Sequence, residues 1–387
     1  MLPSFRKDPV LYCSAAAALV TVILMPFPSS YLAFIDFRVL SLLFSLMVVT
    51  AGLTDTGFFD RLVRKLLDSS GGIRMLSLTL TGACFFASML ITNDVSLITF
   101  VPLSVLLLEK AGRKNLLIPV IVLQTLAANL GSMFTPMGNP QNLYLYVRSG
   151  MSAFSFLKLM APVTFLSLLL LILSVFLLVH PDKKEEGPGT GRNSAAAPGT
   201  MQGRNGRSAE RIFKSDSLPW LILFLICILS VSRVLHYGAA LAVVSVFTLL
   251  TNRKILLKAD YSLLLTFVFF FIFTGNMGRI PAVSSFLSSA VNGREMTIGI
   301  LLSQFISNVP AAMLLSGFTQ NFTPLILGVD IGGLGTLIAS MASLISYKIY
   351  IRTEDAKPSA YLCFFTVMNV IYLVILSGAA FFLTRQM

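Results

Sequence analysis

Two short polar segments interrupt long apolar runs in the first half of this chain, and two more do so in the second half. The first pair is residues 92–94 (Thr-Asn-Asp) and residues 135–142 (Thr-Pro-Met-Gly-Asn-Pro-Gln-Asn). The second pair is residues 307–310 (Ser-Asn-Val-Pro) and residues 330–336 (Asp-Ile-Gly-Gly-Leu-Gly-Thr). Polar groups are costly inside the hydrocarbon of a membrane, so such segments indicate functional sites. We therefore expect the four segments to form one central site for an ion and a solute.

The apolar runs themselves predict the fold class. Stretches of about 20 apolar residues recur along the chain, which is the length needed to span a bilayer as a helix. Hydrophobic residues make up 56% of the chain and charged residues 12%, against roughly 25% charged residues in a soluble domain. A transmembrane β-barrel would instead show short alternating segments. The sequence predicts an all-α polytopic membrane protein that lies in a lipid bilayer.

The net charge of +12 predicts membrane orientation and not a nucleic-acid partner. The lysines and arginines lie in short loops between apolar segments, as the positive-inside rule describes for cytoplasmic loops. We expect the N-terminus and the central linker to be cytoplasmic. The cysteines and histidines show no metal-ligand spacing, and the sequence shows no convincing nucleophile–base pair. We therefore expect no cofactor and no enzymatic activity.

Two long segments in the first half predict broken or folded helices. A straight helix over residues 75–109 would be about 52 Å long, against a hydrocarbon core of about 30 Å. Basic residues flank both of its ends, which favours a re-entrant hairpin with its tip at residues 92–94. The alternative is two ordinary helices with an external polar turn. Residues 115–147 predict a helix broken at residues 131–142, because glycines and prolines interrupt it.

The remaining segments complete two similar halves. Residues 1–180 form the expected first transmembrane repeat, residues 181–217 a flexible cytoplasmic linker, and residues 218–387 the second repeat. The second half predicts a hairpin over residues 297–319 and a broken helix over residues 324–351 that is interrupted at residues 330–335. The other expected helices are residues 10–27, 37–52, 57–67 (on the membrane surface), 153–179, 218–234, 237–251, 261–274, 278–292 (interfacial) and 360–383.

The two halves are predicted to form an inverted-topology repeat. Hairpin, broken helix and final span follow in the same order, but the basic loops fall on opposite sides of the matched elements. The second half has one more helix before its hairpin, which lets the shared elements reverse. Inverted repeats of this kind are common in secondary transporters.

Four motifs resemble those of the ion transporter superfamily. They are residues 91–95 (Ile-Thr-Asn-Asp-Val), 135–142, 307–311 (Ser-Asn-Val-Pro-Ala) and 332–338 (Gly-Gly-Leu-Gly-Thr-Leu-Ile). That superfamily includes divalent-anion/sodium symporters, citrate transporters, arsenite permeases and one class of sodium/proton antiporter. The chain looks most similar to its arsenite-permease-like and anion-permease branch. It departs from the dicarboxylate symporters, whose hairpin tips read Ser-Asn-Thr.

The resemblance implies which residues bind sodium and solute, and it implies a homodimer. In the related symporters the hairpin tips and the facing broken-helix loops form the binding sites. The expected ion- and solute-binding residues here are Thr92, Asn93, Asp94, Thr135, Gly138, Asn139, Asn142, Ser307, Asn308, Val309, Gly332, Gly335 and Thr336.

Three charged residues leave alternatives open. Asp94 is the expected coupling residue, as a sodium ligand or a proton carrier, or it only caps the second helix of the hairpin. Asp330 either joins the site or faces solvent near the loop. Arg279 either attracts an anion or extends to the membrane interface.

The sequence as a whole predicts a secondary active transporter in the cytoplasmic (inner) membrane. Its expected partners are a small anionic solute, either a carboxylate or an inorganic oxyanion, and sodium or a proton as coupling ion. A sodium/proton antiporter and an arsenite or antimonite permease are the alternatives.

Overall fold

The computed structural model describes residues 9–25, 31–59, 61, 72–180 and 216–386, and within these ranges the regular elements are helices. Six helical segments are long and apolar enough to cross a membrane. The chain is therefore an all-α polytopic membrane protein, as predicted. The six segments are Phe37–Asp55, Gly72–Ile91, Lys114–Ser132, Ala153–Leu178, Tyr261–Gly278 and Pro358–Arg385.

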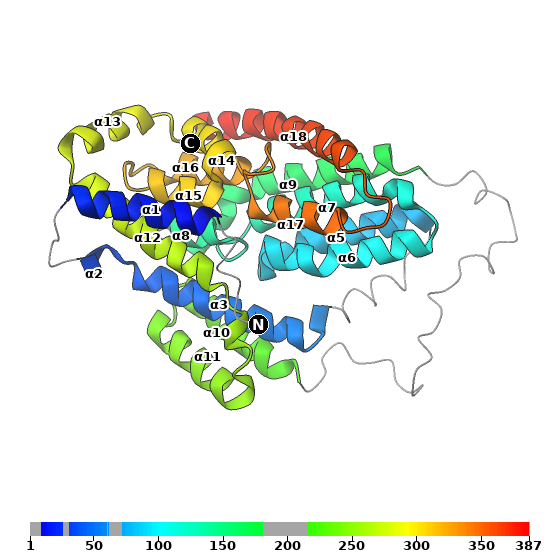
Figure 1. The fold of residues 1–387 in the computed structure, drawn as a ribbon, viewed down its shortest axis with the longest axis horizontal. Helices are drawn as coiled ribbons and strands as arrows, with labels where there is room; N and C mark the ends of the chain where they lie inside the picture. Colours follow the sequence, from blue (N-terminus) through cyan, green and yellow to red (C-terminus); the bar gives the residue numbers. More distant parts are fainter. Residues whose placement is uncertain (1–8, 26–30, 60, 62–71, 181–215, 387) are drawn as a thin grey trace, which may run out of the picture.

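The elements follow the predicted order, with boundaries that shift by a few residues (Figure 1). The first half contains α1 (Pro9–Leu24), α2 (Tyr31–Phe34), α3 (Phe37–Asp55), α5 (Gly72–Ile91), α6 (Asn93–Lys110), η2 (Lys114–Leu116), α7 (Leu117–Ser132), α8 (Pro140–Ser149) and α9 (Ala153–Leu178). The second half contains α10 (Leu218–Val231), α11 (Tyr237–Asn252), η3 (Leu256–Lys258), α12 (Tyr261–Gly278), α13 (Pro281–Val291), α14 (Glu295–Ile306), α15 (Asn308–Leu315), α16 (Phe322–Ile331), α17 (Met341–Tyr350) and α18 (Pro358–Gln386).

Some predicted segments lie outside the described residues. These are the end of the predicted first span, most of the predicted surface helix over residues 57–67, and residues 181–215 of the predicted linker. The short helix α2 was not predicted, because its four residues carry no recognisable periodicity.

Each predicted hairpin consists of two packed helices joined by one non-helical residue. Thr92 separates α5 from α6 with φ 72° and ψ 152°, and Ser307 separates α14 from α15 with φ 73° and ψ 155°. Positive φ is uncommon for residues other than glycine, so the same strained backbone recurs at both tips. The breaks are shorter than predicted, because Asn93 and Asn308 already begin the second helices. The depth of the tips in the membrane stays a prediction.

The two broken helices differ more from their predicted limits. Residues 133–139 separate α7 from α8, which is shorter than the predicted break, and residues 332–340 separate α16 from α17. The second break was predicted to begin at Asp330 and to end at Gly335, but α16 extends to Ile331 and the loop extends to Ser340. The Gln304 side chain explains the longer loop. Its Nε2 donates to the carbonyls of Gly332 (2.9 Å) and Leu334 (3.0 Å), so these loop groups have partners without a helix.

The same hydrogen bonds join hairpin to broken helix in both halves. The Asn93 N–H donates to the Gly138 carbonyl (3.3 Å), and the Asn308 N–H donates to the Ala339 carbonyl (3.0 Å). Gly138 and Ala339 each directly precede the N-cap residue of the second half-helix.

Two threonines form a second matched pair of contacts. The Thr135 hydroxyl donates to the Met89 carbonyl, and the Thr336 hydroxyl donates to the Gln304 carbonyl (3.0 Å). Met89 and Gln304 each lie three residues before their hairpin tip. The two halves therefore build the same hairpin–broken-helix unit. The inversion of one unit relative to the other across the membrane stays a prediction.

The two units interlock. Helix α6 of the first hairpin packs against α17, and α15 of the second hairpin packs against α8. Each hairpin thus contacts the second half-helix of the other unit. Outside this centre, α9 and α18 pack on α7, α1 packs on α12, and α10 and α11 pack on α3 (Figure 1).

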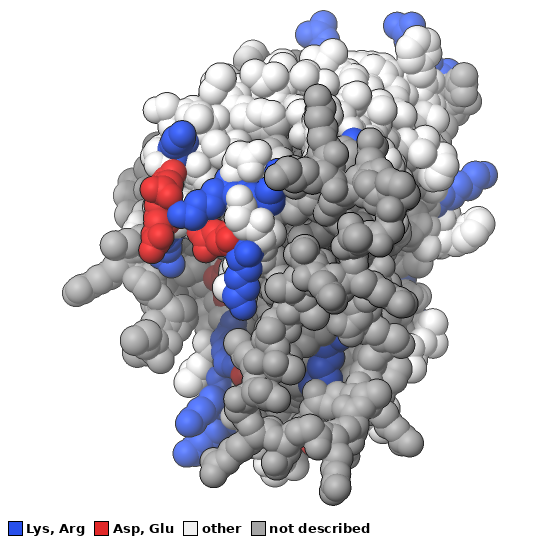
Figure 2. All heavy atoms as spheres, turned by 90° about the vertical axis from the view of Figure 1, so that its right-hand side faces the viewer, with Lys and Arg blue, Asp and Glu red and all other residues white. Residues whose placement is uncertain are grey.

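Two loops that were both predicted to be cytoplasmic meet at one end of the molecule. Lys114, after α6, forms an ion pair with Asp355 (2.8 Å), after α17. Figure 2 shows charged side chains gathered on this end. The hydrogen bond from Lys114 and its positive charge lower the pKa of Asp355. The structure thus places both loops on the same side of the molecule.

Close packing of α5 on α7 leads to a test of the fold. A Cβ atom at Gly131 would lie 2.1 Å from the Phe85 carbonyl oxygen and 2.5 Å from Ser88 Oγ, whereas a Cβ at Gly82 would meet nothing within 4 Å. We expect Gly131→Ala to lower the melting temperature or to prevent folding, because backbone atoms of α5 must move. Gly82→Ala, the control on α5, should keep or slightly raise stability, by up to about 1 kcal/mol. Thermal denaturation in detergent measures both, and equal melting temperatures would contradict the close contact.

Candidate functional site

Both hairpin tips and both broken helices line one small cavity of about 70 Å³. The tip residues Asn93 and Asp94 come from the first unit, and Ser307, Asn308 and Val309 come from the second. The half-helices contribute Pro140 and Gln141 of α8, Ser340, and Met341 of α17. The structure therefore brings together the polar segments that the sequence analysis singled out, from residues more than 200 positions apart.

Four helices begin at this cavity. Helix α6 starts at Asn93, α8 at Pro140, α15 at Asn308 and α17 at Met341, and all four residues line it. The first N–H groups of a helix lack partners within the helix, and the aligned peptide dipoles place partial positive charge there. Four converging N-termini make the cavity suited to an anion.

A second cavity of about 270 Å³ adjoins the first. The two share Asp94, Pro140, Asp260 and Leu263. The second cavity extends between α3 and the first hairpin, and it also touches Thr92 and Asn139. It provides space that leads from the hairpin tips toward the end of α3.

Two carboxylates line both cavities. Asp94 lies in the first turn of α6, and Oδ1 of its side chain is buried without a hydrogen-bond partner. Thr92, and not Asp94, occupies the N-cap position of α6. Asp260 is the N-cap of α12 and accepts a hydrogen bond from the Leu263 N–H (3.0 Å). An acidic residue near a helix N-terminus is favourable, and two together provide oxygen ligands for a cation beside the anion-suited helix ends.

The sequence analysis missed Asp260. An Asp directly before an apolar run is a recognisable helix start, but nothing in the sequence places that helix start beside the first hairpin. Only the packing of the second half against the first does so.

A polar network behind the cavity wall joins the two units. Asn129 Oδ1 accepts hydrogen bonds from Asn93 Nδ2 (3.2 Å) and from Ser340 Oγ (3.0 Å). Ser340 is the N-cap of α17, so a residue of the first unit holds the second unit's half-helix.

The reverse contact is made by Asp330. Its Oδ1 accepts hydrogen bonds from Asn139 Nδ2 (3.1 Å) and from Gln141 Nε2 (3.5 Å). Asn139 is the N-cap of α8, so Asp330 and Asn129 occupy matching places in the two units. Asp330 is only 5% exposed. The alternative in which Asp330 faces solvent is therefore wrong, and burial between the two broken helices is the reason.

The predicted site residues divide into two groups. Thr92, Asn93, Asp94, Asn139, Ser307, Asn308 and Val309 line one or both cavities. The others lie outside the lining and shape the loops; these are Thr135, Gly138, Asn142, Gly332, Gly335 and Thr336. Their expected part in binding stays a prediction.

Glycine is required at Gly138 and at Gly335 for different reasons. A Cβ at Gly138 would lie 2.1 Å from the Ser132 carbonyl oxygen, inside the loop itself. Gly335 has φ +100°, a backbone conformation that residues with a side chain rarely adopt. Both glycines therefore let the broken helices fold tightly behind the cavity.

Arg279 lies far from this arrangement along its helix. It is the exposed C-cap of α12, at the opposite end from Asp260. It is not among the residues that line the two cavities. The structure therefore gives no support to Arg279 as an anion ligand.

Comparison with known proteins places the chain in a family. A sequence model described as citrate transporter matches residues 8–324. The chain belongs to the citrate transporter family. This confirms the resemblance to the ion transporter superfamily, whose members include the citrate transporters.

Individual relatives are also membrane proteins by name. A transporter of Methanocaldococcus jannaschii is 29% identical over 91% of this chain and 92% of its own length. An inner membrane protein of Escherichia coli is 31% identical over 84% of this chain and 83% of its own length. A silicon efflux transporter of Oryza sativa is 40% identical, but over only 32% of this chain and 25% of its own length. This family member is therefore a multi-pass integral membrane protein of a transporter family.

The two hydrogen bonds at Asp330 lead to a test of the network. Asp330→Ala should destabilise the protein, because it leaves the Gln141 amide without its acceptor and the Asn139 amide with only the long contact to Ser132 Oγ (3.4 Å); a buried donor without an acceptor costs about 1–3 kcal/mol. Asp330→Asn keeps an acceptor oxygen and copies Asn129 of the other unit, so its loss of stability should be clearly smaller. Thermal denaturation compares the two variants. Equal destabilisation would show that the acceptor oxygen does not hold α8.

Proposed function

We propose that this protein is a secondary active transporter that moves a small anion across the cytoplasmic membrane. The solute is a carboxylate or an inorganic oxyanion, and sodium or a proton is the coupling ion. The convergence of four helix N-termini at one cavity carries this proposal, because it supplies positive electrostatic potential where the two units meet. The inner-membrane relative from Escherichia coli supports the proposed location.

Asp94 is the proposed coupling residue. Its carboxylate lines both cavities and comes from the tip of the first hairpin. A cation bound there would offset the carboxylate charge and allow the anion to bind nearby, which is the basis of symport. Asn93 and Asn308 are proposed to hold the solute or the ion, since their amides can donate to an anion or accept from a cation.

A weakly charged solute is the second candidate. Among the described residues that line the first cavity, none is a lysine or an arginine, and two are aspartates. A strongly charged anion would meet no cationic side chain there. The similarity of one segment to a silicon efflux transporter and the resemblance to arsenite permeases favour an arsenite or antimonite permease as this alternative. A sodium/proton antiporter that uses Asp94 and Asp260 is the third.

Replacing the tip asparagines tests the proposed site. Asn93→Ala and Asn308→Ala should each reduce uptake into proteoliposomes to near background, since each removes an amide from the cavity. The proteins should still fold, because even Asn93 loses only two side-chain hydrogen bonds, to Asn129 Oδ1 and from the Asp94 N–H, and each contributes only about 1 kcal/mol. Asn115→Ala, at an exposed position of the 3-10 helix η2 before α7, is the matched control and should keep normal uptake. Undiminished uptake by both tip variants would refute the proposed site.

Ligand-dependent stability distinguishes the candidate functions. The melting temperature of the purified protein should rise with citrate or sulfate, and only in the presence of sodium or at low pH. A melting temperature that rises with arsenite, but not with citrate or sulfate, would indicate the permease. A melting temperature that rises with sodium, rises less at low pH and does not change with any anion would contradict anion transport and indicate antiport.

A further inference from the structure

Lys258 has a particular place among the cavity-lining residues. Among the described residues that line the two cavities, it is the only lysine or arginine. It lies at the end of η3, two residues before Asp260, and it lines the second cavity but not the first. One short segment thus presents a cation to the second cavity and a carboxylate to both cavities.

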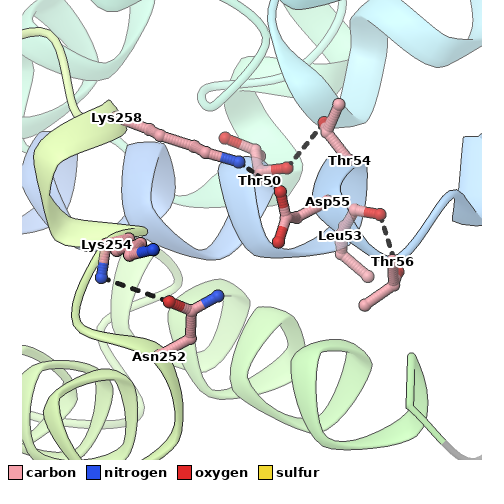
Figure 3. A network of polar contacts seen from close by, with 8 residues as sticks. All are labelled: Thr50, Leu53, Thr54, Asp55, Thr56, Asn252, Lys254 and Lys258. Carbon is pink, nitrogen blue, oxygen red and sulfur yellow. Dashed lines mark hydrogen bonds and ion pairs between the residues drawn. The ribbon is translucent and has the colours of Figure 1, made fainter. Parts of the chain in front are cut away.

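Lys258 is held by an ion pair at this position. Figure 3 shows its side chain reaching from η3 across α3 to Asp55, close to Thr50. Thr50 lines the same cavity, so the ion pair lies beside the lining and not on a remote surface. Asp55 is the last residue of α3, where the helix dipole disfavours a negative charge. The lysine therefore offsets an unfavourable carboxylate.

This ion pair is easily exchanged. The side chains of Lys258 and Asp55 are 47% and 39% exposed. Ion pairs between such exposed groups contribute little, because water and salt screen them. An arriving carboxylate or oxyanion can therefore replace Asp55 as the partner of Lys258 at small cost.

We propose that Lys258 is the capture residue for the anionic solute at the mouth of the second cavity, with Asp55 as its partner while the cavity is empty. The solute exchanges with Asp55 at Lys258 and then moves to the helix N-termini of the first cavity. The inference rests on the proposed anion transport. Because the basic loop before α12 is predicted to be cytoplasmic, this mouth is the cytoplasmic one.

Lys254 provides the matched control. It is exposed, lies in the same basic loop, and lines neither cavity. Its backbone N–H, and not its side chain, donates to Asn252 Oδ1 (3.2 Å) (Figure 3). Removing either lysine changes the net charge equally, so the comparison separates capture at Lys258 from a general effect of surface charge.

The test measures initial rates of citrate, sulfate and arsenite transport from the Lys258 side, for Lys258→Gln, Lys254→Gln and Asp55→Asn. Lys258→Gln should raise KM for citrate or sulfate by up to about fivefold, since an exposed ion pair contributes up to about 1 kcal/mol, with little change in maximal rate. Lys254→Gln should keep the wild-type KM. Asp55→Asn should lower KM, because it removes the competing carboxylate.

Several outcomes overturn the inference. Equal rises in KM for both lysine variants would indicate surface charge alone, and a rise in KM for Asp55→Asn would indicate a purely structural ion pair. If the protein transports arsenite alone and Lys258→Gln does not change that transport, then Lys258 does not capture the solute, although the protein is a transporter. If Lys258→Gln does not fold, the Asp55→Asn/Lys258→Gln double variant, which leaves neither charge behind, takes its place. Wild-type protein that transports none of the three solutes would refute the proposed function itself.

Discussion

The fold depends on satisfying backbone groups where helices stop inside an apolar protein. An unpaired N–H or C=O group is costly away from water, so interrupted helices survive at membrane depth only where protein or a water-filled cavity supplies partners. Here the first N–H of each hairpin's second helix donates to a carbonyl of the facing broken helix, from Asn93 to Gly138 and from Asn308 to Ala339. Each tip thus completes the break beside it, and neither could adopt this form alone.

A second layer of contacts couples the two units to each other. Asn129 holds the N-cap of α17, and Asp330 holds the N-cap of α8. Buried polar groups of this kind are favourable only when they are paired, so a change in one unit is felt in the other. The two residues occupy matching positions, so the likeness of the two units includes the bonds between them. The amide of Asn129 and the carboxyl of Asp330 are one difference between the units, beside the longer loop of the second broken helix.

The electrostatics of the site arise from two opposing sources. Helix N-termini supply partial positive charge from the backbone, and Asp94 and Asp260 supply negative charge from side chains. Neither source alone suits a transporter that couples an anion to a cation. Together they create a favourable position for an anion beside a favourable position for a cation. This is the physical basis of the proposed coupling. Lys258 lines the second cavity and not the first, so in the proposal it attracts the anion before the helix N-termini of the first cavity bind it.

Patterns in the sequence are enough to predict the class of fold, the order of elements and the places where helices are interrupted. Long apolar runs can only be stable in a bilayer as helices, and Thr92, Ser307 and the glycine-rich segments interrupt them in both halves. The tip asparagines were identified because a polar residue in an apolar run is conspicuous without any structure.

The tertiary structure alone decided what surrounds those tips. Asp260 and Lys258 carry ordinary local signals, a helix cap and a basic loop, and they reach the cavities only because α12 packs against α3 and α15. The loop after α16 runs to Ser340 because the Gln304 side chain replaces helical hydrogen bonds, a contact made from another helix. Asp330 is buried because α8 covers it. Such features depend on residues distant in the chain, and local propensity does not encode them.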